Sequence, residues 1–252
     1  MRKLTSFFFL FLFFIYGCKS SNSGNDDLSE GIYSHTEDVG TSANDFLSSS
    51  SFTSLVIEVD YVIGYKPSQN ALTNLKIFLE SRLNKPGGIT ITLDDEIPSL
   101  GKSSYSAQDA YNLEKEHRNR YSDGVELASY FIVLDGQFED ENVLGFAYFN
   151  TSMALIGGTI EEHTGGLGQP SKAVVETAVL NHEFGHILGL VDNGSPAVQD
   201  HIDKEHGAHC DVESCLMYYA VRTSGFVANL MGGNVPELDE QCIQDLQANG
   251  GK

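Results

Sequence analysis

The stretch HEFGHILGLVD, residues 182–192, decides how this sequence is interpreted. His182 and His186 are four residues apart, so on a helix their imidazoles lie on one face, about one turn apart, and reach a single metal ion. Zinc prefers neutral imidazole nitrogens, and a catalytic zinc site keeps one position open for water. Glu183 lies on the adjoining edge of that helix, where its carboxylate can take a proton from the activated water and deliver it to a leaving amine. The pattern predicts a catalytic Zn²⁺ site on a helix.

The helix that carries this motif is expected over residues 172–190. Pro170 and Ser171 precede it, and Gly189 ends it. Four apolar residues recur at helical spacing on the face opposite the histidines: Leu180, Phe184, Ile187 and Leu188. One side of the helix is therefore expected to pack in the core while the other carries the site.

The remaining sequence alternates between strand-like and helix-like segments. Alternating or continuous β-branched residues predict strands over 55–63, 89–93 and 127–134, and two more within 143–160, broken near Asn150. Helical spacing or composition predicts the other helices over three further segments: 70–83, 106–120 and 236–248. This order predicts an α/β fold in which helices cover a sheet.

The segment HEFGHILGLVD also resembles the extended zinc signature of the metzincin metalloproteases, HExxHxxGxxH or HExxHxxGxxD. The resemblance implies that the chain bends at Gly189 and that Asp192 is the third metal ligand. Three further histidines follow within seventeen residues of Asp192, and any one of them could take its place on the metal: His201, His206 and His209. The third ligand is thus open among four residues.

The segment Cys215-Leu216-Met217-Tyr218-Tyr219 resembles the Met-turn of that family, S-x-M-x-Y, with Cys in the Ser position. By this resemblance Met217 lies beneath the metal-binding histidines and Tyr219 stabilises the transition state. The implied fold is a zincin-like catalytic domain: a twisted mixed sheet, an active-site helix and a C-terminal helix. An edge strand, either 143–149 or 153–160, is expected to pair with the extended substrate.

The N-terminus resembles that of a bacterial lipoprotein. Residues 1–17 combine a basic start with a short apolar run, as a signal peptide does, and Ile15-Tyr16-Gly17-Cys18 resembles a lipobox. The resemblance implies cleavage before Cys18, lipidation of its thiol, and an exported protein on a bacterial envelope membrane, most simply the outer one. The polar residues 18–50 are expected to form a flexible tether, and 51–252 the catalytic domain.

Charge and cysteine content limit the partners. With 15 Lys and Arg against 35 Asp and Glu, the formal charge is −20, which argues against nucleic acid or an anionic membrane surface as a partner. Once Cys18 is lipidated, three cysteines remain. Cys210–Cys215 is the favoured disulfide and Cys215–Cys242 the alternative. The Cys pair before the Met-turn also resembles archaemetzincins, which hold a second zinc with four cysteines; because this chain offers three, no second zinc is expected.

These observations lead to one hypothesis and one rival. The hypothesis is a monomeric, zinc-dependent endopeptidase that acts on peptides or proteins, is held to the membrane through its lipid alone, and uses Glu183 as general base and acid. The rival is a non-catalytic envelope lipoprotein that keeps the scaffold as a binding module. Glu183 favours the hypothesis, since a purely structural metal site gains nothing from a carboxylate beside an open position.

Overall fold

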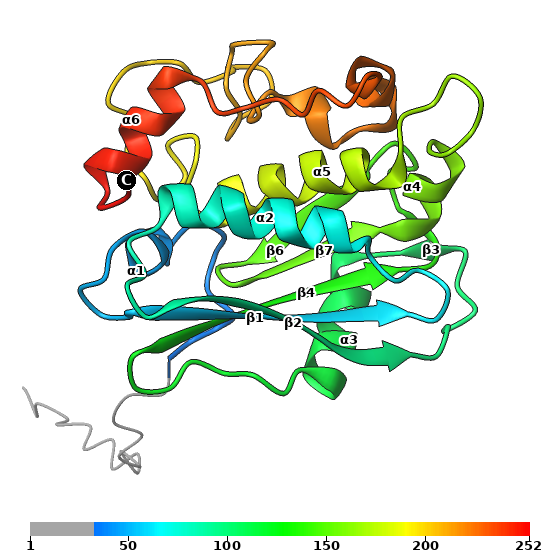
Figure 1. Ribbon diagram of the computed structural model, residues 1–252, viewed down its shortest axis with the longest axis horizontal. Helices are drawn as coiled ribbons and strands as arrows, with labels where there is room; N and C mark the ends of the chain where they lie inside the picture. The colour runs from blue at the N-terminus through cyan, green and yellow to red at the C-terminus, as the bar shows by residue number, and fades with distance from the viewer. Residues whose placement is uncertain (1–32) are drawn as a thin grey trace, which may run out of the picture. The chain divides into compact units, whose positions relative to one another are not determined.

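The computed structural model describes residues 33–252, and a five-stranded sheet forms its centre (Figure 1). The strands follow the spatial order β2-β1-β4-β7-β6. Their bounds are β1 Ser54–Val62, β2 Gly88–Ile97, β4 Glu126–Leu134, β6 Gly145–Phe149 and β7 Ser152–Ile156. Neighbouring strands are parallel, except that β6 runs antiparallel to β7. The sheet is therefore mixed, and β6 is one of its two edges.

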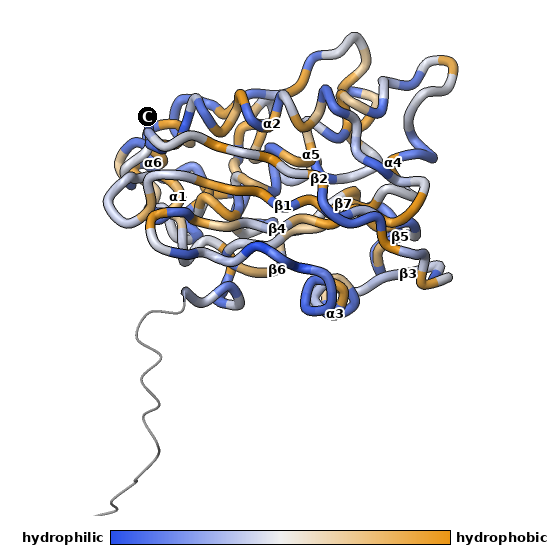
Figure 2. Tube along the Cα trace, turned by 60° about the horizontal axis from the view of Figure 1, so that its bottom comes forward, coloured by the Kyte–Doolittle hydropathy of each residue, from blue (hydrophilic) through white to orange (hydrophobic). Residues whose placement is uncertain are grey.

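Helices cover both faces of this sheet. On one face lie α2 (Gln69–Arg82) and α5 (Lys172–Ile187), and on the other lies α3 (Ala107–His117) (Figure 1). Because both faces are covered, the central strands β1 and β4 are buried almost throughout, which explains their near-continuous apolar sequences. Figure 2 shows hydrophobic residues concentrated along these strands and a largely hydrophilic α3.

The other elements surround this sandwich. A small parallel sheet joins β3 (Ser104–Tyr105) to β5 (Gln137–Phe138), and α4 (Gly157–Glu162) follows β7. After α5 the chain runs without helix or strand to two 3-10 helices, η1 (Tyr219–Arg222) and η2 (Ser224–Leu230), and ends in α6 (Glu240–Ala248). The predicted α/β architecture, with a long helix that carries the histidine motif and a C-terminal helix, is confirmed.

Residues 33–50 belong to the folded part of the chain, so the fold begins earlier than the predicted boundary at residue 51. This segment contains the short helix α1 (Ala43–Leu47), whose Phe46 and Leu47 are fully buried in the main core. The Phe46 ring packs edge-on against Phe184 of α5, with 6.1 Å between ring centroids. Burying these two large apolar side chains offsets the conformational entropy that is lost when a short segment becomes ordered. The number of serines in the segment does not reveal this burial.

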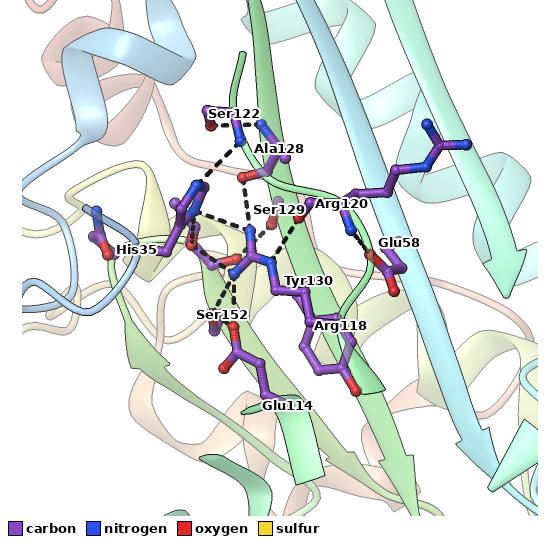
Figure 3. Close-up of polar contacts among 12 residues, drawn as sticks. His35, Glu58, Glu114, Arg118, Arg120, Ser122, Ala128, Ser129, Tyr130 and Ser152 are labelled. Atoms are coloured by element: carbon purple, nitrogen blue, oxygen red, sulfur yellow. Dashed lines mark hydrogen bonds and ion pairs between the residues drawn. The ribbon is translucent and has the colours of Figure 1, made fainter. Parts of the chain in front are cut away.

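A buried polar network ties the same segment to the sheet (Figure 3). The Arg118 guanidinium donates to Glu114 at 2.6 Å and lies 2.9 Å from Nδ1 of His35. The other ring nitrogen of His35 accepts from the backbone N–H of Ser122 at 3.2 Å. Burial, and then the charge of Arg118, lowers the pKa of His35 to about 3, so this imidazole stays neutral.

The predicted signal peptide, residues 1–17, and the lipidation site Cys18 lie outside the described residues. Within residues 33–252, no helix is both long and apolar enough to cross a membrane.

Candidate metal centre

Helix α5 presents the histidine motif inside the protein. It lies between the sheet and the segments that follow it, so that every residue from Val175 to Ile187 is buried. The apolar stripe predicted for its far face, which includes Leu180 and Phe184, is fully buried in the main core. His182 and Glu183 are likewise fully buried, and His186 is 7% exposed.

Three imidazoles converge at this helix: His182 and His186 from α5, and His209 from the segment that precedes the Met-turn sequence. One ring nitrogen of each lies within 4.8 Å of one ring nitrogen of the other two. The Nε2 atoms of His182 and His186 are 3.1 Å apart. The ring of His209 stacks on that of His182, with centroids 5.3 Å apart, and meets that of His186 edge-on at 4.8 Å. The sequence-predicted pair is therefore brought together, with a third histidine beside it.

The hydrogen bonds of two of these rings leave an unprotonated nitrogen on the side of the cluster. Nδ1 of His182 donates to the Leu216 carbonyl at 2.7 Å, and Nδ1 of His209 donates to the His206 carbonyl at 2.9 Å. Because a carbonyl only accepts, Nε2 of each of these two neutral rings carries a lone pair. Nε2 of His209 is buried without any hydrogen-bond partner within the described residues. A divalent ion would satisfy this otherwise costly group.

The protonation state of the three rings also fits a metal. Burial lowers the pKa of His186 to about 3, and it lowers the pKa values of His182 and His209 as well. The rings are therefore neutral, which is the form that zinc binds.

Glu183 projects beside the imidazoles. Its Oε2 accepts the backbone N–H of Ala147 in β6 at 2.9 Å, whereas its Oε1 is buried and has no partner among the described residues. Burial raises the pKa of Glu183 to about 7, although the charge of Arg222 and the bond from Ala147 act in the opposite direction. A carboxyl group with a pKa near neutrality can both accept and release a proton.

Asp192 lies apart from this cluster. The chain bends at Gly189, whose φ of +79° and whose contacts with the backbone of residues 194 and 195 leave no room for a side chain. Asp192 follows in an exposed turn with a φ of +52°, and its Oδ1 accepts the N–H of Ala197 at 3.4 Å. The structure thus places His209, and not Asp192, beside the two helix histidines.

The other two candidate histidines have different surroundings. His206 is bonded to Asp203, with 2.7 Å between Nδ1 and Oδ2, and its ring stacks on Tyr219 at a centroid distance of 3.6 Å. His201 is buried in a second cluster, together with Cys210 and Cys242.

Met217 lies beneath α5. A Cβ atom on Gly185 would overlap with its Sδ, so the thioether packs directly against the helix at Gly185, which lies between the two histidines in sequence. Met217 is fully buried. Its role as a floor beneath the metal stays a prediction.

Two cavities open at the cluster. The smaller, about 190 Å³, is lined by Glu183, His186, His209 and Arg222, together with Val39 and Ala147. The larger, about 450 Å³, shares His209 and Arg222 and is bordered by Tyr219 and Val143. Because β6 forms the sheet edge and β7 is interior, the strand predicted over 143–149 is the one beside the cluster.

A second group of metal-binding residues lies where the sequence predicted a disulfide. Cys210, Cys215 and Cys242 are buried free thiols. The Sγ atoms of Cys215 and Cys242 are 3.6 Å apart, and Nδ1 of His201 is 3.4 Å from Sγ of Cys210 and 4.0 Å from Sγ of Cys242. His201 thus adds an imidazole to the thiols, and Oδ2 of Asp239, 3.6 Å from Sγ of Cys210, is a further candidate donor, so the lack of a fourth cysteine does not exclude a second zinc.

The surroundings of these groups suit a metal thiolate. Nε2 of His201 is 2.8 Å from a carboxylate oxygen of Asp245, which holds Nδ1 toward the sulfurs as carboxylates commonly do for metal-binding histidines. The backbone N–H groups of Met217 and Asp239 each donate to Sγ of Cys215 at 3.4 Å. The bonds with Cys210 and Cys242 lower the pKa of Cys215, whereas the bonds with the other two thiols raise the pKa of Cys242, and the bond with Cys215 raises that of Cys210. Three thiols and one imidazole form a donor set that structural zinc prefers.

The fold can be compared with solved structures. The archaemetzincin of Methanopyrus kandleri is similar over 78% of this chain and 96% of its own, with a TM-score of 0.53 and 13% sequence identity. Metalloproteinase-II of Bacteroides fragilis is similar over 87% of this chain and 58% of its own, with a TM-score of 0.47 and 14% identity. No family model and no curated protein matches the sequence. The likeness to archaemetzincin defines the fold as zincin-like, as predicted.

Proposed function

We propose that this protein is a zinc-dependent peptidase. The observation that carries the proposal is the convergence of three buried, neutral imidazoles with the unpaired carboxyl oxygen of Glu183 beside a shared cavity. His182, His186 and His209 would hold the ion. Three nitrogen ligands leave one position of a tetrahedral site open, as in catalytic rather than structural zinc sites.

The chemistry divides between the ion and the side chains. Zinc supplies Lewis acidity, which polarises a carbonyl group and lowers the pKa of water to about 7. Glu183 takes a proton at Oε1, since Oε2 is already bonded to the Ala147 N–H, and returns it to the leaving amine. Tyr219 borders the larger cavity with His209 and would donate its hydroxyl to the developing oxyanion. The edge of β6 would hold an extended peptide through the main-chain groups that the bond between Ala147 and Glu183 leaves free.

The test is Glu183→Ala in the zinc-loaded protein, assayed on a proteome-derived peptide library. Peptide cleavage should fall by at least about 100-fold, the lower range for general acid–base catalysis, while zinc content stays unchanged. Glu80→Ala, which removes an exposed carboxylate from α2, is the matched control. Cleavage at the wild-type rate by the Glu183 variant would refute its role. Peptide binding by a wild-type protein that cleaves nothing would favour the rival, a binding module.

We further propose that Cys210, Cys215, Cys242 and His201 hold a second, structural zinc ion. Elemental analysis of the intact protein should give two zinc ions per chain. Cys242→Ser should remove one of them and lower the thermal stability, because binding free energy at such a site is also folding free energy. A wild-type protein with one zinc, which Cys242→Ser retains, would contradict this assignment.

The N-terminal resemblance supports a further proposal: the peptidase is exported and anchored as a monomer to a bacterial envelope membrane by lipid on Cys18. Cys18→Ser should then move the protein from the membrane fraction to the soluble fraction of the host cell. Light scattering of the detergent-solubilised protein would check its oligomeric state. A Cys18→Ser variant that stays with the membrane would refute the lipid anchor.

A further inference from the structure

Arg222 occupies a fixed position at the border of the metal centre. It is the last residue of η1, and its carbonyl accepts the N–H of Leu144 at 2.8 Å. The next residue, Thr223, forms a β-bridge with Val143. These contacts bind the backbone of η1 to the segment that leads into β6, so the base of the Arg222 side chain is held in place.

The side chain lines both cavities. It lines the smaller one with Glu183, His186 and His209, and the larger one with His209 and Tyr219. The guanidinium group therefore borders the same cavities as the proposed general base and two of the proposed metal ligands.

This guanidinium has no partner of its own. Among residues 33–252 no ion pair and no side-chain hydrogen bond involves Arg222, in contrast to Arg118, which is bonded to Glu114. Asp140 also lines the larger cavity, but its Oδ1 accepts from the backbone and side chain of Asn142. In a chain with 35 acidic residues against 15 basic ones, an arginine left unpaired at a cavity has its five donors available for a ligand.

The course of β6 directs a substrate toward this side chain. The strand begins at Gly145, and the N–H of the preceding Leu144 already donates to the backbone carbonyl of Arg222. A peptide that pairs with the open edge of β6 therefore cannot continue past Leu144. It must leave the strand next to Arg222 and the larger cavity.

From this geometry we infer that Arg222 determines specificity: its guanidinium binds a carboxylate of the peptide substrate at the border of the metal centre. A planar guanidinium binds a carboxylate through two parallel hydrogen bonds, and such charge-assisted bonds are about twice as strong as neutral ones. The carboxylate is either an Asp or Glu side chain or the free C-terminus of the peptide. The inference rests on the proposed peptidase function and names its substrate class, acidic peptides.

The experiment compares wild type, Arg222→Gln and Arg222→Lys on a proteome-derived peptide library, with cleavage sites read by mass spectrometry. Wild type should show Asp and Glu enriched at one fixed position from the cleaved bond, or cleavage at a fixed distance from the C-terminus. A library with amidated C-termini separates these two sources. Arg120→Gln is the matched control for net charge. It removes an exposed positive charge from the face of the sheet that α3 covers, opposite to α5.

Matched peptides that differ only in Glu or Gln, or in free acid or amide, give the magnitude. Arg222→Gln should lower the ratio of kcat/KM between the acidic and the neutral peptide by about 10- to 100-fold, the range for a hydrogen bond to a charged group. Arg222→Lys should restore part of that ratio, and Arg120→Gln should leave it unchanged. Calorimetry of the same peptides with Glu183→Gln should show the same preference in binding, without turnover.

The outcomes separate the two proposals. If wild type cleaves neutral and acidic peptides equally well, or if Arg222→Gln slows both equally, Arg222 does not set specificity and the inference is overturned while the peptidase function stands. If the zinc-loaded wild type cleaves no peptide in either library, the peptidase function fails and the inference falls with it.

Discussion

Replacing His209 by Asn should remove one zinc ion from the protein, whereas replacing Asp192 by Asn should remove none. Asn at position 209 keeps a donor close to where Nδ1 bonds the His206 carbonyl but lacks the buried, unpaired Nε2 that faces His182 and His186. Asn at position 192 tolerates the φ of +52° and removes the carboxylate. The pair of variants therefore separates the two candidates for the third ligand with little change in backbone strain.

The expected loss follows from the ligand count. Losing a residue that only orients a ligand costs about 10- to 100-fold in metal affinity, so losing one of three ligands should cost at least about 100-fold. At about 1.4 kcal/mol for each factor of ten, this is about 2.8 kcal/mol or more. Asp192 is exposed and its carboxylate bonds only a neighbouring turn, so its replacement should change zinc affinity by less than about twofold.

Elemental analysis after dialysis against a weak chelator, followed by competition titration with a chelating dye, measures both quantities. Wild type and Asp192→Asn should retain two zinc ions per chain, and His209→Asn should retain one, in the cysteine cluster. That remaining ion also shows that the variant is folded. The reasoning is refuted if Asp192→Asn loses an ion while His209→Asn keeps both.

Two further predictions concern the fold around the centre. Gly185→Ala should lower the free energy of unfolding by about 1–3 kcal/mol, since its Cβ would overlap with Met217. Urea denaturation measures this loss, and equal stability of Gly185→Ala and wild type would contradict the packing. Replacing His35 by Gln should reduce the acid sensitivity of the protein. In the unfolded chain His35 takes up a proton near pH 6.5, whereas in the folded chain its pKa is about 3. The contribution of the neutral imidazole to the free energy of unfolding is therefore complete above pH 6.5 and is lost as the pH falls. Between pH 6.5 and 4.5, wild type should lose about 1–2 kcal/mol more than His35→Gln in urea titrations, and parallel pH profiles would disprove the assignment.

Local patterns predicted the elements of the fold well. The predicted strand 127–134 starts one residue after β4 and ends at the same residue, and the predicted helix 70–83 is shifted by one residue from α2. Hydrophobic periodicity is a local property that depends on which face of an element is buried, so a single sequence reveals it. The motif in α5 was predictable for the same reason, since helical spacing alone places His182 and His186 on one face.

The third histidine could not be derived in this way. Between Gly189 and His209 the chain contains no helix and no strand, and no hydrophobic periodicity predicts where His209 lies relative to α5. The several histidines over residues 201–209 indicated that one of them could be the third ligand, but they did not show which one. The predicted end of the tether at residue 50 was wrong for a related reason. Phe46 and Leu47 are a short apolar pair in a polar stretch, and only their partners in the core show that they are buried.

The segment from His209 to Met217 connects the two proposed metal sites. His209 faces the helix histidines, while Cys210 and Cys215 face Cys242 and His201. The carbonyl of Leu216 orients His182, and Met217 supports the helix from below. Backbone hydrogen bonds from Cys210, Cys215 and Leu216 hold this segment, although it has no regular secondary structure. Ordering it costs about 1–2 kcal/mol per residue in backbone entropy. An ion bound by Cys210 and Cys215 would fix the segment on either side of the loop between them, and with it the position of the adjacent His209. If both proposed sites bind zinc, the cysteine cluster would hold the proposed third ligand in place at the end of a long irregular segment.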